Sequence, residues 1–219
     1  MVDTRTRIAS GLLEIGAVFF RPHQPFTWAS GIKSPVYCDN RLILSAPDLR
    51  NLVENALADL ISATHPGVEM IMGTATAGIA HAALVAERLN LPAGYVRAAS
   101  KDHGRQNQIE GKMAPGTKVV VVEDLISTGG SVLDAVAALR EGGATVLGVV
   151  SIFSYGMQKG KRRFEDANVA ASSLITFDVM AHVAADSGFI TQADVAKLLA
   201  FRDNPADKSW MDKNNNEGN

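Results

Sequence analysis

The hydrophobic residues of this chain recur in two patterns, one typical of amphipathic helices and one typical of buried strands. From Pro47 and Asp48 onward, leucine, valine and alanine return every three or four residues, which predicts a helix. Similar helical spacing recurs at 79–89 and 131–141. Short apolar runs typical of buried strands lie between and after these three helices, at 68–72, 93–97, 119–122 and 145–151.

The alternation of strands with helices predicts an α/β fold with a mostly parallel, doubly wound sheet. Gly142 and Gly143 end the helix at 131–141, because glycine is the usual residue just past a helix terminus. Near the C-terminus, Thr191 followed by Asp194 has the spacing of a capping box. A further helix is therefore expected to begin at Thr191.

The segment 118–131 combines an apolar run, two adjacent acids and a turn of small residues. Its four consecutive valines, without polar alternation, favour a central strand that is covered on both faces. Ligands of open α/β sheets bind at the carboxyl ends of the strands. Glu123 and Asp124, which follow the valines, are therefore expected at a ligand-binding edge.

The turn 128–131, Thr-Gly-Gly-Ser, is suited to binding a phosphate. It offers backbone N–H groups and hydroxyls directly before a predicted helix, where free amides and the helix dipole attract anions. Ionised Glu123 and Asp124 only accept hydrogen bonds, so they suit vicinal sugar hydroxyls. Together these groups predict a site for a ribose 5-phosphate.

Other nucleotide-binding patterns are absent from the sequence. Neither G-x-x-x-x-G-K-[ST] nor G-x-G-x-x-G occurs, which excludes the P-loop and the dinucleotide fingerprint. A structural alternative is a buried strand followed by an ordinary capped helix, with both acids solvated. That alternative is disfavoured because two carboxylates next to a buried strand are costly to bury without partners.

The connection 98–117 is polar, contains glycines and is longer than an ordinary link between two strands. Long segments of this kind often serve as active-site lids, although a solvated surface loop is the alternative. Arg97, Lys101, His103 and Arg105 gather positive charge in or beside it. Such a cluster suits the binding and release of a pyrophosphate.

Composition narrows the class of protein. The chain has 219 residues, of which 47% are hydrophobic, enough for one α/β domain with a full core. A net charge of −2 without a basic block argues against non-specific binding to nucleic acid or membrane surfaces. Cys38 is the single cysteine, so no internal disulfide forms. No signal-like start and no apolar run of about 20 residues occurs, and a cytoplasmic location is expected.

The segment 118–131 resembles the phosphoribosyl pyrophosphate signature of the type I phosphoribosyltransferases. Two further segments, 26–41 and 97–111, resemble the orotate phosphoribosyltransferases of that family, and the likeness runs from near Leu12 to about Leu199. The resemblance implies transfer of the 5-phosphoribosyl group from phosphoribosyl pyrophosphate to orotate in pyrimidine nucleotide (UMP) synthesis. The products would be orotidine 5′-monophosphate and pyrophosphate.

The resemblance also implies the organisation of the chain. A single domain, 1–219, would consist of a core at about 66–175 and a small hood over its ligand edge, built from 1–65 and 176–211. The segment 212–219 has no apolar anchor and is expected to be a disordered tail. In the family the lid closes over the active site of the neighbouring subunit, which implies a homodimer with shared sites.

The residues expected to bind phosphoribosyl pyrophosphate are Arg97, Lys101, His103, Glu123, Asp124, Leu125, Ile126, Ser127, Thr128, Gly129, Gly130 and Ser131. The expected catalytic residues are four of these. Glu123 and Asp124 favour the positive charge that develops on the ribose ring, and Lys101 and His103 neutralise the departing pyrophosphate. His103 can also donate a proton to it. Mg²⁺ is expected to be held mainly by the substrate, with no direct protein ligand, because it prefers phosphate oxygens and water.

Orotate needs donors for its carboxylate and a flat wall for its ring, and Ser127, Lys33 and Tyr37 are the candidates. Ser127 matches the family position that contacts orotate. The turn 73–79 is expected to approach pyrophosphate through backbone N–H groups, although a plain strand-to-helix turn is the alternative. Tyr155 stands where some family members have an arginine that reaches the base.

Two other functions remain open. A purine-specific phosphoribosyltransferase would share the same signature and reaction class. The fold also serves in sensor modules whose output is nucleic-acid binding. A sensor of that kind would need a basic face or an added DNA-binding domain, and the slightly acidic balance of this chain argues against it.

Overall fold

The computed structural model describes residues 3–27, 31–98 and 108–211. Its centre is a six-stranded sheet of order β10-β9-β8-β5-β6-β7. The strands are β5 (Met70–Thr74), β6 (Ala93–Val96), β7 (Ile109–Glu110), β8 (Lys118–Ile126), β9 (Thr145–Ser154) and β10 (Ala171–Thr176). The short β7 pairs antiparallel with β6, and the other neighbouring strands pair in parallel. The mostly parallel α/β sheet predicted from the sequence is confirmed.

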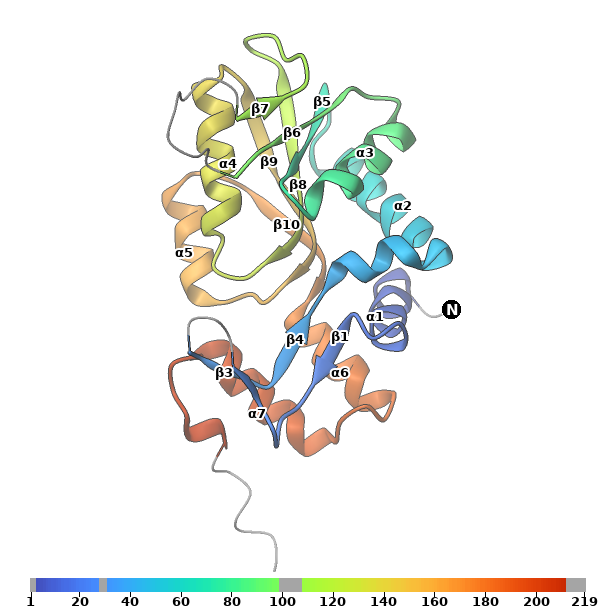
Figure 1. Cartoon of the computed structure of the whole chain (residues 1–219), viewed down its shortest axis with the longest axis vertical. Coiled ribbons are helices and arrows are strands. Elements are labelled where there is room, and N and C mark those ends of the chain that lie inside the picture. The colour runs from blue at the N-terminus through green and yellow to red at the C-terminus, as the bar shows by residue number, and fades with distance from the viewer. Residues whose placement is uncertain (1–2, 28–30, 99–107, 212–219) are drawn as a thin grey trace, which may run out of the picture.

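Helices cover both faces of this sheet (Figure 1). One face carries α1 (Thr4–Glu14), α2 (Pro47–Thr64) and α3 (Gly78–Leu89), and the other carries α4 (Gly130–Glu141) and α5 (Gln158–Asp166). The four valines at 119–122 are fully buried. Val120 and Val122 pack in the core beneath α1 to α3, whereas Val119 and Val121 pack with α4. This two-sided burial explains the valine run without polar alternation.

Helix α3 is joined to α2 by a polar contact inside the core. Nδ1 of His81 lies 2.5 Å from Oε1 of Glu54, and both side chains are fully buried. Since α3 follows directly from the turn after β5, this contact also holds that turn in place.

The remaining elements gather at the end of the sheet where β10 leads into α6 (Figure 1). They include two antiparallel pairs, β1 (Val18–Phe20) with β4 (Val36–Cys38) and β2 (Phe26–Thr27) with β3 (Lys33–Ser34). The others are the 3₁₀ helices η1 (Asn40–Ser45) and η2 (Ser209–Met211) and the helices α6 (Phe177–Asp186) and α7 (Gln192–Asp203). These elements come from the ranges predicted to form the hood, although α2, from the same N-terminal range, packs against α3 and β9.

Several local predictions can be compared with the structure. Helix α2 begins at Pro47, and Thr191 and Asp194 form the expected capping box at the start of α7. Strand β8 continues to Ile126, so the two acids lie within the strand and not after it. Helix α5 and strand β10 were not anticipated. Residues 212–219 lie outside the described part of the chain, and no helix within that part is long and apolar enough to cross a membrane.

Candidate active site

Two neighbouring carboxylates lie in the second half of β8. Glu123 is buried and Asp124 is partly exposed, and the backbone N–H of Asp124 donates to Oε1 of Glu123 at 3.0 Å. Nδ2 of Asn40, a fully buried residue of η1, donates to the carbonyl oxygen of Asp124 at 2.7 Å. This hydrogen bond ties the N-terminal part of the chain to the carboxylate pair. Asn40 was not predicted as a site residue.

Glu123 has an unusual protonation equilibrium. Burial, a hydrogen bond to the Asp124 carboxylate and the charge of that group together raise its pKa to about 8, while hydrogen bonds from the Thr74 hydroxyl and the Asp124 backbone oppose the shift. At neutral pH the Glu123 carboxyl is therefore mostly protonated. Two ionised acceptors were expected from the sequence, and for Glu123 that expectation changes because the neutral carboxyl can also donate a hydrogen bond.

The turn between β8 and α4 has the geometry of an anion site. Gly129 is the N-cap residue of α4 and adopts a left-handed conformation with φ of 73°. In the described chain no side chain caps this end of α4, so its first backbone N–H groups are available to a ligand.

Helix α5 packs closely beneath the same turn. Nη1 of Arg163 donates to the carbonyl oxygen of Thr128 at 3.3 Å. A Cβ atom added at Gly160 would lie 3.0 Å from the carbonyl oxygen of Ser127, and one added at Gly129 would lie 2.8 Å from the ring of Phe164. Sequence reasoning missed these supporting residues. The one local signal was Gly160, whose missing side chain lets α5 approach the turn.

The turn between β5 and α3 lies across from the carboxylates. Oγ1 of Thr74 donates to the carbonyl oxygen of Val122 in β8 at 3.3 Å, and the peptide bond between Ala75 and Thr76 is cis. Gly78 packs so closely on β8 that an added Cβ atom would lie 2.5 Å from the same Val122 oxygen. The backbone of this turn is thereby held at a fixed distance from β8.

These elements surround one cavity of about 440 Å³. Its lining comes from three parts of the chain, the segment 38–41, the turn 75–77 and the region from the end of β8 to α4, and the residues are Cys38, Asp39, Arg41, Ala75, Thr76, Ala77, Glu123, Asp124, Leu125, Ser127 and Ser131. The structure thus brings together the carboxylate pair and the two ends of the predicted small-residue turn, Ser127 and Ser131, whereas Thr128, Gly129 and Gly130 are not among the lining residues. Ile126 is buried, so it offers the site its backbone alone.

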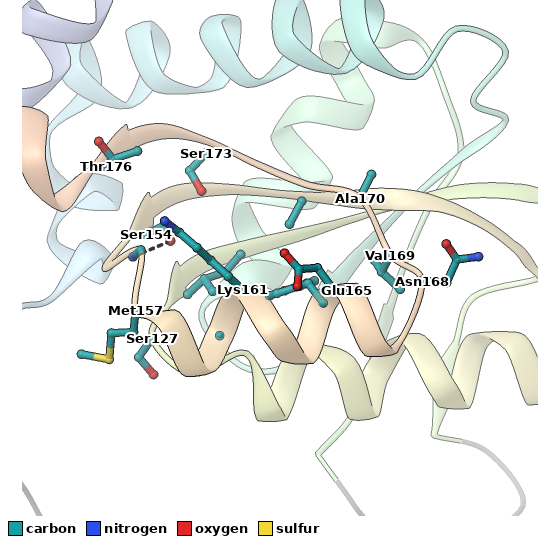
Figure 2. A pocket seen from close by; sticks show the side chains of 15 residues that line it. Ser127, Ser154, Met157, Lys161, Glu165, Asn168, Val169, Ala170, Ser173 and Thr176 are labelled. Atoms are coloured by element: carbon teal, nitrogen blue, oxygen red, sulfur yellow. Dashed lines mark hydrogen bonds between the residues drawn. The ribbon is translucent and has the colours of Figure 1, made fainter. Parts of the chain in front are cut away.

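A second cavity, of about 600 Å³, lies between α5 and β10 (Figure 2). Ser127 lines both cavities, but neither Glu123 nor Asp124 lines this one. Figure 2 shows Lys161 extending from α5 toward Ser154. The chemistry predicted for a ribose 5-phosphate therefore belongs to the smaller cavity, which contains the carboxylate pair.

Other predicted site residues lie outside the cavity that contains the carboxylates. Arg97 follows β6 and pairs with Glu110, with 3.1 Å between Nη1 and Oε1. Nζ of Lys33 donates to Oγ1 of Thr27 at 2.7 Å, and Lys33 borders a separate hollow beside Trp210. Tyr37 is 43% exposed. Lys101, His103 and Arg105 lie outside the described residues.

Tyr155 and Cys38, two further residues near the cavity, are both largely shielded from solvent. Tyr155 is buried, and its ring stacks on that of Phe177 with centroids 5.8 Å apart. Burial raises the pKa of Cys38, whose thiol donates to Oδ1 of Asn40 at 3.3 Å, so Cys38 is a poor nucleophile. Among the described residues, no group of three or more His, Cys, Asp or Glu side chains is arranged to hold a metal ion.

Comparisons with known proteins agree with this geometry. The family model of the phosphoribosyl transferase domain matches residues 42–184. The chain is 57% identical to an orotate phosphoribosyltransferase of Bacillus cereus over 207 residues, which is 94% of this chain and 99% of that protein.

Two solved structures that have the same fold are similar to this chain along most of its length. An orotate phosphoribosyltransferase from Aeropyrum pernix has a TM-score of 0.73 and 30% identity, covering 84% of this chain and 99% of that one. UMP synthase of Leishmania donovani has a TM-score of 0.77 and 26% identity, covering 90% of this chain and 42% of that one. The chain therefore belongs to the phosphoribosyl transferase domain family and, within it, to the orotate phosphoribosyltransferases.

Proposed function

We propose that the chain transfers the 5-phosphoribosyl group from phosphoribosyl pyrophosphate to orotate, giving orotidine 5′-monophosphate and pyrophosphate for UMP synthesis. One observation carries the chemistry. A carboxylate pair, an uncapped helix N-terminus and a second tight turn line the same cavity. These are the groups that a pentose with a phosphate at one end and a pyrophosphate at the other requires.

The order of the strands supports a placement of the substrate. The 5-phosphate would bind the backbone N–H groups of 128–131, and the ribose hydroxyls would bind Glu123 and Asp124. Strands β5 and β6 lie on one side of β8, and β9 lies on the other. The pyrophosphate would therefore face the turn 75–77 and the segment after β6, and orotate would enter from the side of β9, next to Ser127.

The carboxylate pair would act on the ribose ring during the reaction. As the bond from C1 to pyrophosphate breaks, positive charge develops on the ring, and a nitrogen of orotate forms the new bond to C1. Asp124 and an ionised Glu123 would stabilise that charge. The pKa of Glu123 is about 8, and the approach of a cationic ring would lower it and so favour loss of its proton.

Mg²⁺ and the lid complete the proposal. When bound, Mg²⁺ would neutralise charge on the pyrophosphate oxygens, and the carboxylate oxygens at the cavity could accept hydrogen bonds from its bound waters. Arg97, Lys101 and His103 would bind the departing pyrophosphate. We also propose that the protein is a cytoplasmic homodimer in which each lid covers the site of its partner subunit.

A direct assay tests the function. Orotate absorbance should fall when the protein is incubated with phosphoribosyl pyrophosphate, orotate and Mg²⁺, and Asp124→Asn should lower the turnover by about 10²- to 10³-fold. Asp166→Asn, on the exposed end of α5, is the matched control and should keep wild-type turnover. Consumption of adenine or hypoxanthine in place of orotate would assign the chain to purine salvage.

The shared lid predicts complementation between two inactive variants. Lys101→Ala impairs the lid and Asp124→Asn impairs the core, so a mixed dimer should keep one intact site. Equal mixing after subunit exchange should restore about a quarter of wild-type activity, because half of the dimers are mixed and each has one working site. No recovery in dimers shown to have exchanged would mean that each lid closes on its own subunit.

A further inference from the structure

The charges that line the active-site cavity are unbalanced for the substrate it has to bind. Asp39, Glu123 and Asp124 contribute carboxyl groups, and Arg41 contributes the cationic side chain among the described residues of the lining. Orotate carries a carboxylate, which binds best to a charge-assisted hydrogen-bond donor. In the described chain, Arg41 is therefore the residue of this cavity with the right charge for orotate.

Asp39 holds the guanidinium of Arg41 in a defined orientation. Nε and Nη2 of Arg41 donate to Oδ1 and Oδ2 of Asp39 at 2.7 and 2.8 Å, and the backbone N–H of Arg41 donates to Oδ1 at 3.2 Å. The neighbouring Asn40 is fully buried and hydrogen-bonded to the carbonyl oxygen of Asp124. Asp39 thus orients the guanidinium, and buried Asn40 fixes the adjacent backbone, although the Arg41 side chain is 66% exposed. Less conformational entropy is lost when an already oriented side chain binds a ligand.

The contact with Asp39 leaves part of the guanidinium unoccupied. An arginine side chain has five N–H donors, and Asp39 uses one on Nε and one on Nη2. Within the described residues, Nη1 of Arg41 has no acceptor. The two N–H groups along the Nη1–Nη2 edge match the spacing of the two oxygens of a carboxylate, so this edge can bind one in a bidentate manner.

The neighbours of Arg41 place it where the base would lie. Asp124 and the Tyr37 hydroxyl both interact electrostatically with Arg41, so the guanidinium is near one of the two carboxylates and near an exposed aromatic residue. Tyr37 also interacts with Tyr155, which follows β9. Strand β9 lies on the side of β8 opposite to β5 and its turn 75–77. Lys33, a sequence candidate for the same role, is engaged with Thr27.

We propose that Arg41, oriented by Asp39, binds the carboxylate of orotate and thereby selects orotate over pyrimidine bases that lack this group. Arg41 is then a specificity-determining residue, and Asp39 is a positioning residue. The proposal rests on the proposed transfer to orotate, since it assigns one substituent of that substrate.

Binding of two nucleotides, the expected product and its analogue without the carboxylate, measures the contact without turnover. Orotidine 5′-monophosphate and uridine 5′-monophosphate differ in the carboxylate alone, so the ratio of their dissociation constants reports what this group contributes. Titration calorimetry on wild-type protein, Arg41→Gln and Arg41→Lys gives this ratio for each. Arg41→Gln should lower the preference for the carboxylated nucleotide by about 10- to 100-fold and leave the affinity for uridine 5′-monophosphate nearly unchanged. Arg41→Lys should keep part of the preference, since it keeps the charge and loses the planar fork.

Steady-state kinetics separate orotate from pyrophosphate as the partner of Arg41. Arg41→Gln should raise the KM for orotate by about 10- to 100-fold with little change in the KM for phosphoribosyl pyrophosphate. Asp39→Asn should raise the KM for orotate by a smaller factor. Arg162→Gln, an exposed arginine of α5, is the matched control and should change neither constant.

Two results would overturn the assignment of Arg41, and a third result has a different meaning. An unchanged nucleotide preference in Arg41→Gln would show that another group binds the carboxylate. A matching rise in the KM for phosphoribosyl pyrophosphate would assign Arg41 to the leaving group. If wild-type protein consumes no orotate, the proposed function itself is wrong, and this outcome is read from the wild type alone.

Discussion

The two turns that border the active-site cavity follow the same strand-to-helix plan but are supported in different ways. The turn 74–78, after β5, packs against the main chain of β8, because Gly78 and Thr74 both approach the carbonyl oxygen of Val122. The turn 127–131, after β8, rests on side chains of α5, chiefly Arg163 and Phe164. One turn is held by a strand that cannot move without the sheet, and the other by side chains that can adjust.

Because of this difference, the two turns should differ in how well they tolerate an added side-chain atom. A backbone support has no alternative rotamer, so any added atom at the first turn has to displace a central strand. A side-chain support can give way by a few tenths of an ångström at lower cost. The turn proposed to face the departing pyrophosphate should therefore be the more rigid one, and the turn proposed to bind the 5-phosphate the more adaptable one.

Gly78→Ala should have the largest effect. The new Cβ atom would lie 2.5 Å from the Val122 carbonyl oxygen and 2.6 Å from Oγ1 of Thr74. We expect a loss of about 3 kcal/mol in the free energy of unfolding, seen as a fall of about 6–12 °C in Tm. Gly130→Ala is the matched change at the other turn, where the nearest atom is Nη1 of Arg163 at 3.1 Å, and should stay within about 1 kcal/mol of wild type. Equal losses in the two variants would remove the contrast between the turns.

Gly129→Ala should have the next largest effect, for a different reason. Gly129 has φ of 73°, and its added Cβ atom would lie 2.8 Å from the Phe164 ring. The left-handed conformation should cost about 1–2 kcal/mol, measured by chemical denaturation. Movement of the turn should also raise the KM for phosphoribosyl pyrophosphate. If stability falls and this KM does not change, the N–H groups of the turn do not bind the substrate.

Glu123→Gln should change how stability depends on pH. The pKa of Glu123 is about 8 in the folded protein, against an ordinary value of 4.5. Between these values the folded state binds more protons than the unfolded state, so the stability contributed by protonated Glu123 is complete below the lower pKa and is lost as the pH rises through the higher one. The glutamine variant has no such loss.

Thermal unfolding at two pH values checks this prediction. The Tm of Glu123→Gln relative to wild type should be higher at pH 8 than at pH 5, by on the order of 5 °C. Taking the difference between the two proteins removes the pH dependence of their other groups. A constant difference in Tm between pH 5 and pH 8 would mean that Glu123 titrates normally.

Arg163→Ala should have the smallest effect, and this effect should be confined to the turn 127–131. It removes the hydrogen bond from Nη1 to the Thr128 carbonyl oxygen, which is worth about 0.5–1.5 kcal/mol. The KM for phosphoribosyl pyrophosphate should rise by a few-fold, with the KM for orotate unchanged. Arg162→Ala, the exposed neighbour on α5, serves as the control. A fall of several kcal/mol would show that α5 supports far more than this turn.

How well each element was predicted follows the strength of its local pattern. The valine run of β8, the helical spacing of α2 and α4 and the capping box of α7 are local signals, and the structure confirms them. Helix α5 has Phe164 as its one large apolar residue, so its hydrophobic spacing carried little information. Strand β10, at the edge of the sheet, begins with Ala-Ser-Ser, which does not resemble a buried strand.

The site residues also fall into those that a local pattern predicted and those that only the packing of distant segments brings together. The carboxylate pair and the turn that follows it are continuous in the sequence, and the structure places both at one cavity. Asn40 and Asp124 are 84 positions apart, and Arg163 and Thr128 are 35 apart, so no local pattern reveals that they meet. Lys33 and Arg41 are both cations in the same N-terminal segment, and the fold places Arg41 at the cavity and Lys33 beside a different hollow.

The sequence by itself determined the alternation of helices and strands from α2 to β9, the central position of β8 and the chemical groups of the turn proposed to bind phosphate, because hydrophobic spacing and turn residues act over a few positions. The tertiary structure alone decided the raised pKa of Glu123, the support of each turn and the choice of Arg41 over Lys33 at the cavity. These properties depend on burial and on distances between segments far apart in the chain, and both arise when those segments pack together.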